Sequence, residues 1–126
     1  MNTTNVAIAF DKTPSIEDSL ALNELRDSLG ESEISAESHI DQLKVGVKDG
    51  GLTLGLTIAG LALKAIGTLI SAISLWGSKR NYTITFKTGE ITFAANNLSP
   101  KEALAIAQAI KDKAIASDIT VLVSSR

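Results

Sequence analysis

The side chains that most often do chemistry are few and scattered in this chain. Its 126 residues include one histidine, His39, and no cysteine, which excludes cysteine nucleophiles, disulfides and thiolate zinc sites. His39 stands near Asp41 in a stretch of loop character, where a solvated histidine is far commoner than a metal ligand or a general base. Paired carboxylates such as Glu17 and Asp18 lie in a solvated acidic region without the apolar pocket that tunes a catalytic acid. The residues therefore predict no catalytic centre, no metal site and no cofactor.

Two glycines, Gly55 and Gly60, have the spacing of a phosphate-binding loop. The next two positions should carry a lysine and a hydroxyl residue, but they hold Leu61 and Ala62, so the spacing indicates close helix packing instead. The chain also has no cluster of basic residues interleaved with aromatic ones, and nucleic-acid binding therefore has no support.

The charge is distributed unevenly along the chain. Residues 1–50 carry a balance of −6, residues 51–80 of +3 and residues 81–126 of +1, for a net charge of −2. The acidic first third is interpreted as a solvated helix face, because its charges are spread out. Residues 1–10 lack the basic and apolar regions of a signal peptide. We expect a cytoplasmic protein, with association to a membrane as the second option.

An apolar run from Leu52 to Trp76 dominates the middle of the chain, with Lys64 as its one formal charge. As a helix this run would extend about 37 Å, and a bilayer core is about 30 Å thick. The sequence predicts one long apolar helix over residues 52–77. A buried helix, an interface helix and a membrane-spanning helix all remain open at this point.

One side of the predicted helix is small and polar. Its members recur at steps of three and four residues and are predicted to form an interaction stripe: Gly60, Lys64, Gly67, Ser71 and Ser74. Small side chains let two helix backbones approach and hydroxyls can bond across, so the stripe favours a homo-oligomer. Lys64 is either a snorkelling surface lysine or a paired, pore-lining charge.

The end of the run carries Trp76, followed by Lys79 and Arg80. Trp76 has two interpretations, a plug of the core at a helix end or an interfacial anchor beside the basic pair.

Shorter elements flank the apolar run. Asn5–Phe10 is predicted as a strand, and a helix follows from Pro14 to Gly30 with Thr13 as its cap. Residues 33–40 alternate weakly and are predicted as a strand, and residues 41–51 as a mobile connection.

The clearest local signals follow the run. Tyr82–Lys87 and Ile91–Phe93 alternate as the two strands of a hairpin. Ser99 and Glu102 match the capping box of another helix. Ile119–Val123 has no polar face, so it is predicted as an internal or paired strand.

This order predicts a single α+β domain over residues 1–126, with a small, mostly antiparallel sheet covered by helices. A permanent membrane span over residues 52–76 would separate the two halves of that sheet. Membrane engagement is therefore expected only after the helix leaves the domain.

Three features occur in sequence: the glycine-broken lead Asp49–Gly51, a long apolar helix that ends in Leu75–Arg80, and the hairpin Tyr82–Phe93, with a further helix behind them. Residues 50–115 in this order resemble the effector-associated constant component family, small proteins encoded in bacterial conflict and immunity cassettes beside variable effectors such as proteases. The resemblance implies a non-enzymatic assembly or adaptor component that couples to an effector protein from the same gene neighbourhood and oligomerises through its long helix. The alternative is a membrane-perturbing module whose 52–76 helix inserts in the bilayer on activation.

Overall fold

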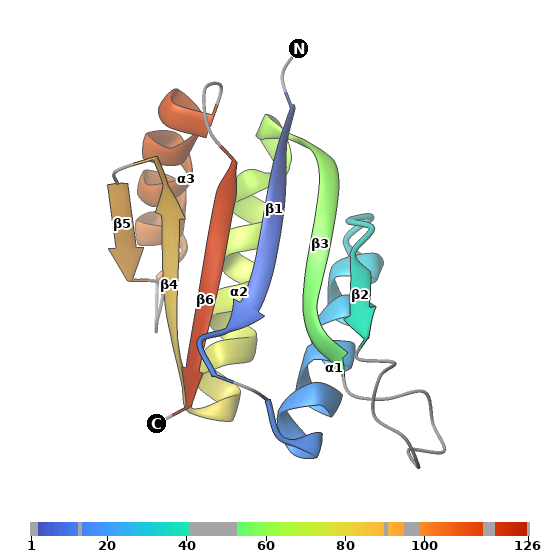
Figure 1. Ribbon diagram of the computed structural model, residues 1–126. Coiled ribbons are helices and arrows are strands. Elements are labelled where there is room, and N and C mark those ends of the chain that lie inside the picture. Colours follow the sequence, from blue (N-terminus) through green and yellow to red (C-terminus); the bar gives the residue numbers. More distant parts are fainter. Residues whose placement is uncertain are drawn as a thin grey trace.

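Six strands form one mixed sheet in the order β2-β3-β1-β6-β4-β5 (Figure 1). The computed structural model of the chain describes residues 3–12, 14–40, 53–89, 91–94, 99–114 and 118–125. The strands are β1 (Thr3–Phe10), β2 (Glu37–Ile40), β3 (Thr53–Ala62), β4 (Tyr82–Thr88), β5 (Ile91–Ala94) and β6 (Ile119–Ser125). The helices are α1 (Ile16–Glu31), the 3₁₀ turn η1 (Leu63–Ala65), α2 (Ile66–Arg80) and α3 (Pro100–Ala114).

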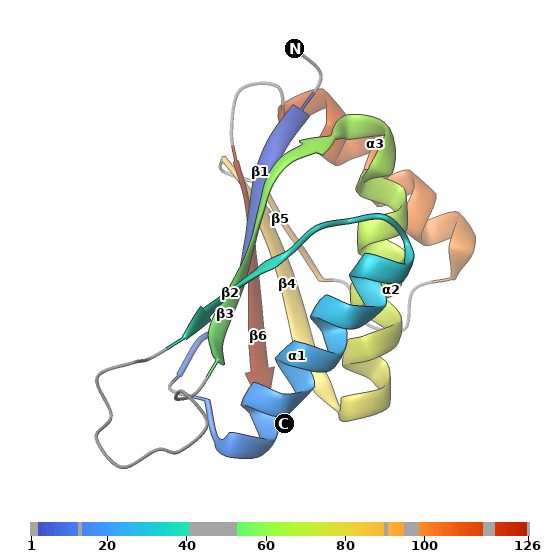
Figure 2. The same ribbon diagram turned by 90° about the vertical axis from the view of Figure 1, so that its right-hand side faces the viewer.

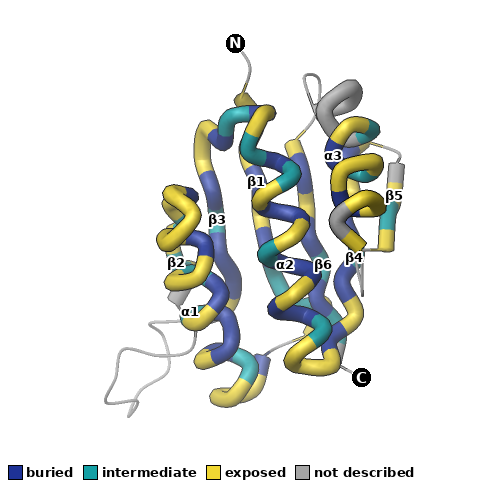
Figure 3. The backbone as a smooth tube through the Cα atoms, turned by 180° about the vertical axis from the view of Figure 1, so that it is seen from behind, coloured by how far each residue is buried: buried dark blue, intermediate teal, exposed yellow. Residues whose placement is uncertain are grey.

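The three α-helices all lie on the same side of the sheet (Figure 2). Seen from that side, α2 lies between α1 and α3 (Figure 3). The core forms between the two layers, where alternate strand residues such as Val6, Leu56 and Phe86 are buried against the helices. None of the helices or strands that the structure describes covers the opposite face of the sheet.

The sheet joins the two halves of the chain at its centre. β1 pairs with β6 in parallel, whereas the other four described pairs are antiparallel. The prediction of a mostly antiparallel sheet is corrected to a mixed one, because the first and last strands meet side by side. The prediction that Ile119–Val123 is a paired, internal strand is confirmed, since β6 has β1 on one side and β4 on the other.

The predicted long apolar helix over residues 52–77 is wrong. Its first part is the strand β3, η1 follows, and α2 begins only at Ile66. Leu56 and Ile58 point into the core with Thr57 between them, which is the alternation of a half-buried strand. Gly60 has a φ of +66°, a left-handed conformation that no helix interior adopts. No helix in the described part of the chain is long and apolar enough to cross a membrane.

The cap of α1 lies two residues beyond the predicted Thr13. The Ser15 hydroxyl accepts the backbone N–H of Asp18 at 3.1 Å, and the Asp18 carboxylate accepts the backbone N–H of Ser15 at 3.2 Å. This reciprocal capping box starts α1 at Ile16. Thr13 itself and the predicted connection 41–51 lie outside the described residues.

The hairpin and the last capping box are confirmed. β4 and β5 pair with Lys87 opposite Thr92, and Gly89 takes a φ of +60° in the turn. The Ser99 hydroxyl accepts the Glu102 N–H at 3.2 Å, and the Glu102 carboxylate accepts the Ser99 N–H at 3.1 Å. The backbone N–H of Ser99, and then its hydroxyl, hold the pKa of the Glu102 carboxyl below its usual value.

Candidate functional site: a groove on the helical face

A groove of about 600 Å³ lies on the outer side of α2, between α1 and α3. Its lining comes from the end of α1, from η1, from the first three turns of α2 and from one residue of α3: Ser28, Ser32, Lys64, Gly67, Thr68, Ser71, Ala72, Leu75 and Leu104. Four of these side chains carry hydroxyls, one carries a positive charge, and the two leucines are 60% and 67% exposed. The groove therefore offers hydrogen-bonding groups, one cation and an apolar end.

Helix geometry explains why these residues share one surface. Lys64, Thr68, Ser71 and Leu75 follow one another at steps of four, three and four residues, which aligns them along one face of a continuous helical segment. Lys64 belongs to η1, which runs directly into α2. The opposite side of α2, with Leu69, Ile70 and Ile73, is fully buried against the sheet.

Lys64 stands where two cavities meet. A second cavity of about 400 Å³, over the end of β3 and the segment after α1, shares Ser32 and Lys64 with the groove. The ion pairs among the described residues are Arg26 with Asp27 and Arg80 with Glu24. The Lys64 ammonium is exposed and has no described carboxylate within ion-pair distance. It is therefore available to an acidic group from outside the chain.

The structure divides the predicted interaction stripe. Lys64, Gly67 and Ser71 line the groove, whereas Gly60 lies on β3 at the second cavity and Ser74 is buried. The division follows from the strand that replaces the first part of the predicted helix.

The two glycines of the stripe also differ in what they permit. At Gly67 an added Cβ would meet the Ala107 Cβ on α3 at 3.7 Å, an ordinary contact. At Gly60 the positive φ strains any other residue.

Trp76 lies in the core at the end of α2 and is only 5% exposed. Its indole N–H donates to the Ala21 carbonyl oxygen at 2.9 Å, and its ring packs on Tyr82 with the centroids 5.1 Å apart. This placement corresponds to the core-plug interpretation and not to an interfacial anchor. Of the basic pair beside it, Lys79 is exposed and Arg80 bonds to Glu24 on α1.

Tyr82 connects this end of the core to the start of α1. Its hydroxyl donates to the Asp18 carboxylate at 2.7 Å, and the same carboxylate accepts the Ser15 N–H in the capping box of α1. Burial raises the pKa of the Tyr82 phenol, and the hydrogen bond to Asp18 raises it further. The contact ties the first turn of α1 to the first residue of β4, so it is a structural link within the fold.

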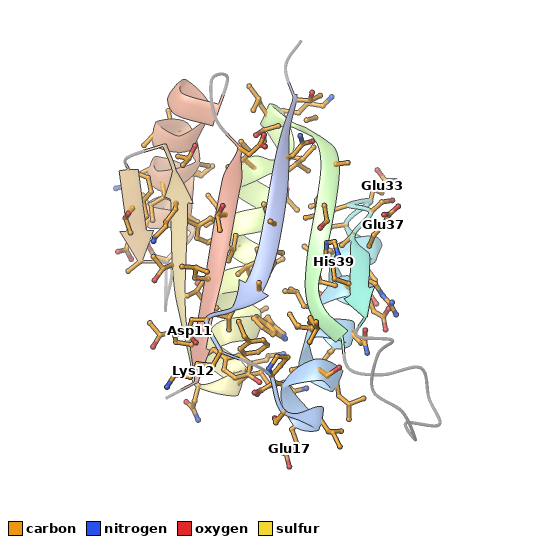
Figure 4. The ribbon with its side chains drawn as sticks, viewed as in Figure 1. Asp11, Lys12, Glu17, Glu33, Glu37 and His39 are labelled. Carbon is orange, nitrogen blue, oxygen red and sulfur yellow. The ribbon has the colours of Figure 1, made fainter. Side chains whose placement is uncertain are left out.

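His39 lies on the uncovered face of the sheet, where its imidazole bonds to the hydroxyl of Thr57 on the neighbouring strand (Figure 4). Within the described ranges, no group of three or more histidine, aspartate or glutamate side chains could hold a metal ion. The described residues around His39 therefore supply no evidence for a reaction centre.

Comparison of the chain with models of protein families, with curated proteins and with solved structures finds no match. The resemblance to effector-associated constant components therefore stays a prediction.

Sequence reasoning missed the α1 and α3 sides of the groove. Ser28 lies in the last turns of α1 and Ser32 is the residue that follows the helix, beyond the predicted end at Gly30, so helical spacing did not bring the two together. Leu104 gave no signal either, because a leucine in an amphipathic helix is normally assigned to its buried face.

Proposed function

We propose that this chain is a non-enzymatic adaptor that holds a segment of a partner protein in the groove over α2. The observation that carries the proposal is the exposed Lys64 cation, which no carboxylate of the described residues pairs, in a hydroxyl-lined groove with exposed leucines at its apolar end. A partner segment with an acidic side chain for Lys64 and apolar side chains for Leu75 and Leu104 matches this surface.

The class of partner comes from the resemblance to effector-associated constant components. It implies that the segment belongs to an effector protein encoded beside this chain in a bacterial conflict system. The adaptor supplies no chemistry in this proposal, and its contribution is to hold the effector in place. Three residues of the predicted interaction stripe, Lys64, Gly67 and Ser71, line the groove, which supports an interaction surface on this part of the chain.

The alternative of a membrane-perturbing module has a specific structural cost. Insertion of residues 52–76 as one helix requires β3 to leave the sheet, where it pairs with both β1 and β2. It also requires the buried side of α2 to lose its contacts with the core. No observation on the described residues favours that rearrangement over the groove.

The test is to purify the chain and its neighbouring effector separately and to measure their dissociation constant by titration calorimetry. Lys64→Glu and Leu104→Ser should each weaken binding at least tenfold, because one reverses the charge and the other removes an apolar contact. Two control variants make the same changes outside the groove: Lys79→Glu on α2 and Leu20→Ser, whose leucine is 63% exposed on α1. Both controls should bind like the unmodified chain.

Two results would count against the groove. The first is an effector that does not bind the unmodified chain. The second is equal weakening by the groove variants and by their controls, since that would place the contact elsewhere on the helical side.

A further inference from the structure

The uncovered face of the sheet is unusually poor in charge. Its side chains are mostly alanine, glycine, threonine and serine, and Figure 4 looks onto them. Among the strand residues that the structure describes, only Glu37 on β2 and Lys87 on β4 carry a formal charge. The nearest further charge is the Asp11 carboxylate just beyond the end of β1, which accepts a hydrogen bond from the Ser124 hydroxyl. A sheet face that stays in water normally carries polar and charged side chains. This face has the composition of a surface that becomes covered.

The register of the sheet places both charges in one row. Pairing across the strands gives two rows that cross all six strands on this face. The first is Glu37–Thr57–Ala7–Thr120–Lys87–Thr92, and the second is His39–Gly55–Ala9–Leu122–Thr85–Ala94.

Within the first row, the acid and the base are symmetric about β1. Glu37 is two strands from Ala7 on one side, and Lys87 is two strands from Ala7 on the other. Neighbouring strands are about 4.8 Å apart, so each charge lies roughly 10 Å from the line of β1. A two-fold axis along β1 would place Glu37 of one copy opposite Lys87 of the other, twice.

The second row shows shape complementarity about the same axis. Leu122 is the largest aliphatic side chain in the two rows and lies one strand from Ala9, while Gly55 lies one strand away on the opposite side. The same axis along β1 puts Leu122 of one copy over Gly55 of the other, a side chain over a position that has none. A residue with a side chain is disfavoured at position 55, because its Cβ would lie 2.6 Å from the Ile8 carbonyl oxygen.

We infer that the uncovered sheet face binds a second copy of this chain, around a two-fold axis that runs along β1 through Ala7 and Ala9. One axis satisfies both the charge symmetry of the first row and the shape symmetry of the second. The alanines on the axis are small enough for the two sheets to meet. Aligned packing of two sheets face to face is a common arrangement in proteins. A two-fold contact also closes on itself, so the assembly stops at two copies.

This inference is independent of the groove, whose lining comes from η1 and the helices. The helices lie on the opposite side of the sheet (Figures 2 and 3). A dimer formed in this way leaves both grooves open, one on each outer surface. The homo-oligomer that the sequence assigned to the apolar helix is thereby assigned to the sheet.

The first experiment reverses the two charges and measures mass by analytical ultracentrifugation over a range of concentrations. The unmodified chain should sediment at twice the 13.2 kDa of one chain. Glu37→Lys and Lys87→Glu should each raise the dimer dissociation constant at least tenfold, because like charges then face each other at two places. The double variant should restore the dimer. Glu31→Lys, which makes the same charge change at the end of α1, should leave it unaltered.

A monomer at every concentration of the unmodified chain would overturn the inference. Single variants that stay dimeric, or a double variant that fails to recover, would overturn this arrangement of the two copies.

The second experiment tests the axis itself and depends less on the charges. The chain has no cysteine, so Ala7→Cys introduces a single thiol on the axis, next to its own copy in the partner. A short bis-maleimide should link this variant into a covalent dimer. Thr92→Cys lies on the same face but three strands from β1, so its two copies would be about 29 Å apart and should not link. Equal linking of both variants, or none of Ala7→Cys, would contradict an axis along β1.

Discussion

The two faces of this sheet share the same strands but carry opposite kinds of surface. The inner face is continuous aliphatic and aromatic packing under three helices, and its stability comes from burial. The outer face carries mostly small side chains and few charges, and no described helix or strand lies above it. Every second residue of a strand therefore serves the fold, and the residues between them are free to serve recognition.

The largest expected difference is between two neighbours on β4. Phe86, which is 1% exposed, faces the helices, and Lys87 faces outward. Phe86→Ala should lower the free energy of unfolding by about 3–5 kcal/mol, because it leaves a cavity in the core. Lys87→Ala, measured at a concentration where the chain is monomeric, should change it by less than about 0.5 kcal/mol. Urea unfolding of both variants gives the comparison, and similar losses would show that the outer face is also structural.

A pair of glycines provides the second contrast. Gly55→Ala should destabilise the chain by about 2 kcal/mol, because its Cβ would overlap the Ile8 carbonyl oxygen at 2.6 Å. Gly67→Ala in the first turns of α2 should stabilise it by about 0.5–1 kcal/mol, since a Cβ there makes an ordinary contact with Ala107. Thermal melting of the two variants measures both signs. Destabilisation by Gly67→Ala would mean that α2 and α3 are packed too closely at Ala107 to accept an added methyl group.

The Tyr82–Asp18 bond predicts a pH dependence. The folded state raises the pKa of the phenol, so the unfolded chain releases this proton first. The contribution is complete below about pH 10, the usual pKa of tyrosine, and is lost as the pH rises further.

Tyr82→Phe should cost about 1–1.5 kcal/mol at neutral pH and remove this alkaline loss. Tyr82 is the only tyrosine, so tyrosinate absorbance reports its ionisation directly. Ionisation at the usual pKa in the folded chain would contradict the buried bond.

The smallest expected effects separate structural hydroxyls from those of the groove. Ser99→Ala removes the cap of α3 and should cost about 1 kcal/mol. Ser71→Ala, at an exposed position in the groove, should change stability by less than about 0.5 kcal/mol but weaken effector binding. Chemical unfolding and calorimetry distinguish the two roles. A loss of stability at Ser71 equal to that at Ser99 would remove it from the binding surface.

Local signals predicted the parts of the fold that local interactions form. The hairpin β4–β5, the Ser99–Glu102 capping box and the strand β6 each carry their pattern within a few residues. β3 does not, because its outward residues are Gly55 and Thr57, as compatible with an apolar helix as with a strand. Its state depends on pairing with β1 and β2, which lie elsewhere in the sequence.

The candidate site was predictable only along one helix. Lys64, Gly67 and Ser71 were found by their spacing, which η1 and α2 preserve. Ser28 and Leu104 join them through the packing of α1 and α3 on α2, a long-range contact that spacing alone does not show.

The parallel pairing of β1 with β6 also determines when this protein can fold during synthesis. Val6 pairs with Ile119, so the centre of the sheet closes only after β6 has emerged from the ribosome. Until then the edges of β1 and β4 that pair with β6 have no hydrogen-bond partners from that strand. Closure of so distant a contact is expected to be the slow step of folding, and a nascent chain paused before β6 is the species that chaperones would have to protect.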